Sequence, residues 1–213
     1  MSTLLQHKPT TGRHGGAHVL GRGYGGDGRP PAERAPAPYT ALVGVGAFLG
    51  AVTMLFIAFT SAYVSRRAEA GWTAIAVPPV LWFNTIALLA SSAALERSRA
   101  RIMRGDSEGL RRGLWVTAAL GAVFVSGQFT AWRQLSAAGL YLTSDPHSAF
   151  FYLLTGVHGL HLLGGLAALG VVLVRATRGA YTRRDHMGVS VFSLYWHFMD
   201  GLWLYLFALL FWA

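Results

Sequence analysis

The sequence predicts an all-α integral membrane protein with five transmembrane helices. Of the 213 residues, 53% are hydrophobic and 13% are charged, which is about half the charged fraction of a typical soluble domain. Five apolar runs reach the roughly 18 residues that a bilayer crossing needs. The arginines gather in the segments between these runs. Together these observations indicate a bundle of helices with basic connecting loops.

The apolar runs place the five spans within one membrane domain, residues 39–213. Their expected bounds are about 39–64, 77–95, 114–132, 149–174 and 188–213. Pro78-Pro79 opens the second span, where a missing amide donor costs least. We expect charged or polar loops over 96–113 and 133–148.

Residues 1–38 are expected to form a flexible cytoplasmic tail. They hold 8 Gly and 5 Pro, and they contain no apolar run of signal-peptide length, so we expect no cleaved signal here. We expect His7, His14 and His18 to be solvated. A metal site or a proton-collecting surface is the alternative for these three histidines.

Charge sets the expected orientation. The tail and the segments after spans two and four hold 5, 6 and 4 Lys and Arg, against 2 and 1 in the segments after spans one and three. The positive-inside rule therefore predicts a cytoplasmic N-terminus and a C-terminus outside. The basic residues behind the net charge of +9 then set the membrane orientation and interact with anionic lipid headgroups, and we expect no nucleic-acid partner. The absence of Cys excludes disulfides, thiolate metal sites and covalent haem attachment.

Small residues predict close helix packing in two spans. Gly46 and Gly50 form a GxxxG pair in the first span. The fourth span has five glycines, at Gly156, Gly159, Gly164, Gly165 and Gly170. In the second span we expect the Asn84 amide to hydrogen-bond to a neighbouring helix, because lipid offers no partner.

Four ionisable side chains lie at membrane depth. His158 and His161 share a helix face, as do His197 and Asp200, because each pair is three residues apart. His158 and His197 both lie roughly 14 Å deep at 1.5 Å per residue, so the two pairs could meet. Gln128 is the strongly polar residue of the third span.

Three interpretations of these residues compete. In the first, they form a hydrogen-bonded cluster that fixes helix packing, and Asp200 accepts from a histidine or a Trp indole. In the second, two histidines ligate a haem between spans four and five. In the third, the groups line a proton or substrate path through a transporter. No P-loop, Gly-x-Ser-x-Gly or HExxH motif is present, and no general acid–base pair can be proposed.

Two stretches carry a family resemblance. FFYLLTGVHGLHLLGG (150–165) and YWHFMDGLWLYLF (195–207) resemble the signature helices of subunit III of haem-copper oxidases. The resemblance covers essentially 41–213, and it includes Trp82, Asn84-Thr85, Ser91-Ser92 and Gln128. The Pro-Pro-x-x-Trp-x-Asn-Thr pattern of span two is closer to bacterial cytochrome c oxidases than to quinol oxidases.

The resemblance implies an accessory subunit of a proton-pumping oxidoreductase. Such a subunit carries no catalytic centre and binds no haem or copper, which reside in partner subunits I and II. It packs mainly against subunit I in the bacterial inner membrane, and it supports assembly and sustained proton uptake in aerobic respiration. It also binds phospholipid. For the headgroups we expect contacts from the basic residues that follow span four: Arg175, Arg178, Arg183, Arg184 and His186.

The sequence departs from the family pattern in two ways. Longer members have seven helices, with a lipid-filled cleft beside the first two, and this chain resembles the shorter five-helix bacterial form. A carboxylate common in the family falls on Val52, so no role of that carboxylate is carried over. The alternatives that stay open are subunit III of a quinol oxidase or nitric-oxide reductase, a b-haem membrane protein and a proton-coupled transporter.

Overall fold

The computed structural model describes residues 38–67, 78–141 and 146–211, and these residues form five helices. The helices are α1 (Pro38–Arg67), α2 (Pro79–Met103), α3 (Ser107–Ala137), α4 (Pro146–Thr177) and α5 (Met187–Phe211). The described ranges contain no strand, and α1 to α4 are long and apolar enough to cross a membrane. This confirms the all-α membrane fold. The expectations for the tail, including His7, His14 and His18, fall outside the described residues.

The expected loop over 96–113 is wrong, because most of it is helical. α2 continues to Met103 and α3 begins at Ser107. The turn between them is set by local chemistry: Gly105 has a φ of 88°, and the Asp106 side chain accepts from the Gly109 amide at 2.7 Å. Hydropathy marks the part of a helix that lies in lipid, whereas caps mark where the helix ends. For the same reason α3 runs on to Ala137, into the second expected loop.

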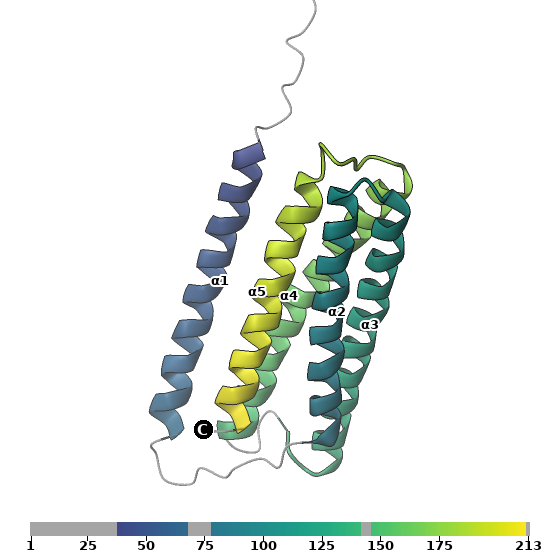
Figure 1. Cartoon of the computed structure of the whole chain (residues 1–213). Helices are drawn as coiled ribbons and strands as arrows, with labels where there is room; N and C mark the ends of the chain where they lie inside the picture. Colours follow the sequence, from purple (N-terminus) through teal and green to yellow (C-terminus); the bar gives the residue numbers. More distant parts are fainter. Residues whose placement is uncertain (1–37, 68–77, 142–145, 212–213) are drawn as a thin grey trace, which may run out of the picture. The chain divides into compact units, whose positions relative to one another are not determined.

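The helices alternate in direction, and α5 lies in the middle of the bundle (Figure 1). It contacts α1, α2 and α4, while α3 contacts α2 and α4. The start of α1, the α2–α3 turn and the α4–α5 loop are therefore at one end (Figure 1). We call it the arginine-rich end, because the described arginines of 97–112 and 175–184 lie near it.

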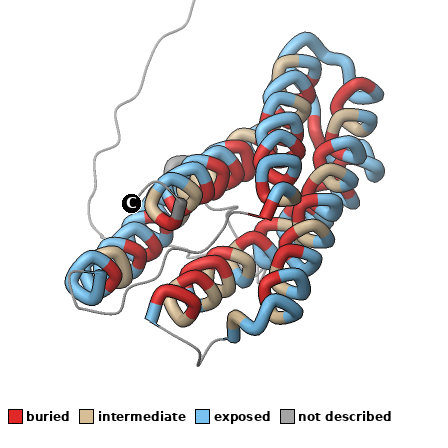
Figure 2. The backbone as a smooth tube through the Cα atoms, turned by 90° about the horizontal axis from the view of Figure 1, so that it is seen from below, coloured by how far each residue is buried: buried red, intermediate tan, exposed pale blue. Residues whose placement is uncertain are grey.

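α1 is the most exposed helix. Its buried residues are Leu49, Val52, Phe56 and Tyr63, which lie on one side of the helix, and the rest of its surface is open (Figure 2). A Cβ added to Gly46 or Gly50 would meet nothing within 4 Å. Within the described chain the GxxxG pair therefore packs against no other helix. Close packing occurs instead at Gly165, where an added Cβ would lie 2.9 Å from the Tyr195 ring.

Candidate functional site

Tryptophan indoles fasten α5 to α2. Trp196 Nε1 donates to Ser91 Oγ at 3.0 Å, and Trp203 Nε1 donates to Thr85 Oγ1 at 3.0 Å. Both tryptophans are almost fully buried. They are seven residues apart, which is about two helical turns, so they lie on one face of α5. In apolar surroundings an indole N–H needs a partner, and the hydroxyls of α2 supply it.

His197 and Glu96 anchor a polar network nearer the arginine-rich end. His197 Nδ1 hydrogen-bonds to Ser92 Oγ, and Nε2 lies 3.4 Å from Glu96 Oε2. Glu96 also accepts from Arg99 at 2.9 Å and from Ser193 at 3.3 Å. Sequence reasoning missed Glu96, because it fell in an expected loop. The available signal was its spacing of four from Ser92, which places both on one face of a helix.

Asp200 is buried beside this network. It is 5% exposed, and neither carboxylate oxygen has a hydrogen-bond partner among the described residues, although the Ser92 hydroxyl, which bonds to His197, is nearby. The expectation that Asp200 accepts from a histidine or a Trp indole is wrong. The indoles of Trp196 and Trp203 each have one N–H, and both already donate to α2 hydroxyls.

His158 and His161 contact different helices. The His158 ring, 1% exposed, lies 5.5 Å from the Trp203 ring and 6.3 Å from the Phe124 ring. The His161 ring lies 6.2 Å from Phe48 and 6.2 Å from Phe56, both on α1. Its Nδ1 donates to the Val157 carbonyl at 2.8 Å. The structure thus gives the four groups different surroundings: His197 is exposed and bonds to α2, Asp200 is buried without a hydrogen-bond partner among the described residues, and His158 and His161 pack against different helices.

Two side-chain amides are buried without partners. Gln128 is 5% exposed and borders a cavity between α3 and α4. Asn84 is fully buried, and the expectation that its amide hydrogen-bonds to a neighbouring helix is wrong. It packs instead against Gly127, where an added Cβ would lie 1.9 Å from Asn84 Oδ1. The missing side chain of Gly127 lets the Asn84 amide approach α3 closely. The backbone of α3 supplies no hydrogen bond there, because its N–H and C=O groups already bond within the helix.

The arginine-rich end has a groove between α1 and the α4–α5 pair. Its volume is about 530 Å³, and Arg175, Tyr181 and Phe48 are among its lining residues. Burial raises the pKa of Tyr181 above its ordinary value, against the opposing effect of Arg175. The other expected headgroup contacts lie in and beside the α4–α5 loop, with Arg178, Arg183 and Arg184 exposed and His186 partly buried.

The described residues contain no group of three or more His, Asp or Glu that could hold a metal ion. In the alternative haem interpretation, histidines of α4 and α5 would face one another, but their neighbours differ: His158 lies against Phe124 and Trp203, whereas His197 bonds to α2. Chemically, these polar side chains join neighbouring helices. Hydroxyl, indole and imidazole groups meet across the α2–α5 and α3–α4 seams.

Comparison with known proteins identifies the family. Residues 42–213 match the family described as Cytochrome c oxidase subunit III. A cytochrome c oxidase subunit 3 of Synechocystis sp. is 34% identical over 180 residues, covering 82% of this chain and 76% of that protein. A probable cytochrome c oxidase subunit 3 of Mycobacterium bovis is 36% identical over 183 residues, covering 82% and 88%. This chain, with its five-helix fold, therefore belongs to the cytochrome c oxidase subunit III family.

Proposed function

We propose that the protein is the non-redox accessory subunit III of a terminal haem-copper oxidase, with cytochrome c as the electron donor. The observation that carries the proposal is the family match over residues 42–213. The relatives bear the name cytochrome c oxidase subunit 3 and come from bacteria. Catalysis then belongs to subunits I and II, and this chain supports assembly and sustained proton uptake in the bacterial inner membrane.

The polar side chains of the bundle support a structural role. Trp196, Trp203 and His197 bond to neighbouring helices, so their polar atoms already have protein partners. A haem ligand needs an imidazole nitrogen facing the iron, whereas the His158 ring, whose nitrogens have no hydrogen-bond partner among the described residues, lies against the rings of Phe124 and Trp203. We propose that this network holds α5 against α2, and that subunit I packs on the resulting bundle.

The exposed face of α1 supports a contact with another subunit. Gly46 and Gly50 lie open on a helix that contacts only α4 and α5 within the described residues. A small-residue face of this kind lets a partner helix approach closely. We propose that a helix of a partner oxidase subunit packs there.

Phospholipid is the ligand we propose at the arginine-rich end. The groove beside α1 is apolar along most of its length and has Arg175 among its lining residues. Arg178, Arg183, Arg184 and His186 follow in and beside the loop. An anionic headgroup would meet these basic groups, and its acyl chains would lie between α1 and α4–α5.

Purification of the tagged chain from its native membrane tests the proposal. Mass spectrometry of the eluate should find oxidase subunits I and II in constant ratio to this chain. Haem and copper analysis should find a dinuclear copper centre in the partner subunit, which indicates cytochrome c. A complex without that centre would assign the chain to a quinol oxidase or nitric-oxide reductase. Recovery without any oxidase subunit would contradict the proposal.

A further inference from the structure

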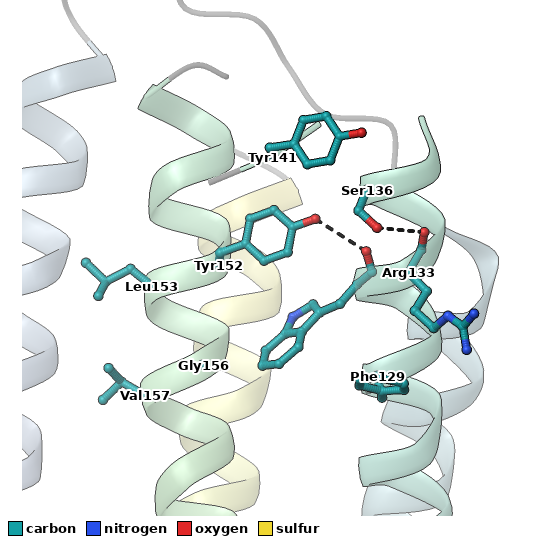
Figure 3. Close-up of a pocket in the computed structure, with 9 residues that line it drawn as sticks. Phe129, Arg133, Ser136, Tyr141, Tyr152, Leu153, Gly156 and Val157 are labelled. Carbon is teal, nitrogen blue, oxygen red and sulfur yellow. Dashed lines mark hydrogen bonds between the residues drawn. The ribbon is translucent and has the colours of Figure 1, made fainter. Parts of the chain in front are cut away.

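A second groove lies along the α3–α4 seam, at the end of the bundle away from the arginine-rich end. It consists of two adjoining cavities of about 660 and 330 Å³, which share Phe129, Trp132 and Gly156 as lining residues. Figure 3 shows Tyr152 reaching from α4 toward α3, with Gly156 one turn farther along α4.

Two glycines leave this groove hollow. A Cβ added to Gly159 would meet nothing within 4 Å, and one added to Gly156 would only reach the Trp132 ring at 4.0 Å. Hydrogen bonds fix the walls: Trp132 Nε1 donates to Thr155 Oγ1 at 3.1 Å, and Tyr152 Oη donates to the Leu140 carbonyl at 2.9 Å. The groove is thus a built feature with immobilised aromatic side chains.

The deeper cavity is bordered by an amide that needs a partner. Gln128 is 5% exposed, and neither its oxygen nor its nitrogen is hydrogen-bonded among the described residues. A buried amide without a partner loses the hydrogen bonds that water would give it. Its N–H groups call for an acceptor, and an ester carbonyl of a ligand in the groove would supply one.

The outer cavity ends at a cation. Arg133 is exposed, its guanidinium carbon lies 6.0 Å from the Phe129 ring centroid, and the structure records no carboxylate against it in the described ranges. Trp132, Tyr141 and Tyr152 line the same cavity, and aromatic residues of this kind are enriched at membrane interfaces. Arg133 is five residues from Gln128, which is about 7.5 Å along the α3 axis and about 140° around it, so the two residues border the outer and the deeper cavity respectively.

We propose that this groove binds one glycerophospholipid, in the leaflet opposite the Arg175 groove. Its phosphate lies at Arg133, an ester carbonyl accepts from Gln128, and one acyl chain runs past Gly156 and Gly159. Arg133 at the outer cavity, the Gln128 amide at the deeper cavity and the open space beside Gly156 and Gly159 offer separate contacts for the phosphate, an ester carbonyl and the hydrocarbon of such a lipid. The proposal requires that the helices span a bilayer, and it does not rest on the accessory function.

Photolabelling of the purified complex tests the site. The complex is placed in nanodiscs of phosphatidylglycerol and phosphatidylethanolamine that contain a trace of phosphatidylglycerol with a photoreactive acyl chain. After irradiation, labelled peptides are mapped and quantified. We expect labels on the α3 and α4 residues that line the groove. Gly159→Leu fills the trough and Arg133→Gln removes one charge-assisted contact, so each should lower labelling there about tenfold.

Matched controls separate the site from general effects. Gly170→Leu adds the same side chain to α4 at another open position, and Arg104→Gln removes an exposed arginine elsewhere. Both should label like the unaltered chain. If the groove is labelled equally in the Gly159→Leu and Gly170→Leu complexes, the proposal is overturned. It is also overturned if the groove residues are found cross-linked to another subunit, because a protein then occupies the groove. If the Gly159→Leu chain does not accumulate, labelling of the groove in the Arg133→Gln complex decides whether the proposal holds. Co-elution of oxidase subunits, read in the same sample, tests the accessory function separately.

Discussion

The indole of Trp203 on α5 donates a 3.0 Å hydrogen bond to the hydroxyl of Thr85 on α2. The same ring lies 5.5 Å from the ring of His158 on α4. One buried side chain therefore contacts two neighbouring helices at once. The Thr85 hydroxyl also donates to the Leu81 carbonyl at 2.9 Å, so it bridges the indole and its own helix.

Replacing Trp203 tests this contact. Trp203→Phe keeps most of the ring but loses the bond to Thr85, and should lower the free energy of unfolding by about 1 kcal/mol. Trp203→Ala leaves a large cavity and should cost about 3–5 kcal/mol. Circular dichroism during titration of the purified chain into denaturing detergent measures both. Trp115→Phe is the control, because Trp115 is 61% exposed, and it should change little. Equal losses for Trp115→Phe and Trp203→Phe would refute the contact's role.

Substitutions of Asp200 distinguish an effect on assembly of the complex from an effect on catalysis. Asp200→Asn removes the charge at nearly constant volume and should leave assembly near normal, because a buried carboxylate is more costly than an amide. Asp200→Ala leaves a gap beside Ser92, and should reduce the amount of this chain that co-purifies with subunit I more than it reduces electron transfer per haem. Quantitative mass spectrometry of the complex and oxygen consumption measure the two effects. Normal assembly together with abolished proton uptake would contradict the structural role.

Substitution by alanine is expected to affect stability differently at two glycines, Gly127 and Gly50. Gly127→Ala would put a Cβ 1.9 Å from Asn84 Oδ1, so the buried Asn84 side chain must move, or α2 and α3 must separate, at a cost of about 1–3 kcal/mol. Gly50→Ala enters open space and should leave the isolated chain as stable or slightly more so, because Ala favours helix. Unfolding of the two variants in detergent provides the comparison. A stable Gly127→Ala chain would show that the α2–α3 contact is looser than described.

Gly50 also tests the partner contact proposed for α1. Gly50→Leu should fold normally in isolation, because nothing lies within 4 Å of an added Cβ. In the complex, however, it should hinder close approach of a partner helix, and so reduce co-purification with the other subunits. Gly170→Leu, at an open position on α4, is the matched control. Normal recovery of the Gly50→Leu complex would remove α1 as the contact surface.

Single cysteines can test the orientation, because the chain has none of its own. With the arginine-rich end in the cytoplasm, Arg184→Cys should resist a membrane-impermeant maleimide applied to intact spheroplasts, and Tyr141→Cys should react. Both positions are exposed in the structure, so both should react after the membrane is opened. The reverse pattern in intact spheroplasts would place the N-terminus outside.

Much of the fold follows from apolar patterning, but the helix ends do not. The start of α2 at Pro79 was predictable, because two prolines precede an apolar run. The α2–α3 turn was not, since Gly105 and Asp106 define it inside a charged segment that hydropathy assigns to a loop. Predicting loops from charge alone therefore underestimates the length of helices that extend beyond the bilayer.

The buried polar residues were predictable one by one, but not their partners. Residues three apart share a face only within about 60°, and that difference directs His158 toward α3 and α5 and His161 toward α1. Which donor meets which acceptor depends on helix rotation and neighbour order, and one sequence does not specify these. The indole–hydroxyl pairs of α2 and α5 join residues more than a hundred positions apart, as in Trp196 and Ser91.

Removal of this chain from the purified oxidase tests the central proposal most directly. Oxygen consumption with cytochrome c and the haem spectrum are measured with and without the chain. We expect the depleted enzyme to keep its haems and its initial rate per haem, to lose activity sooner during turnover, and to regain lifetime when the chain is added back. Loss of a haem signal with the chain, or a Soret band from the chain alone, would contradict a non-redox accessory role.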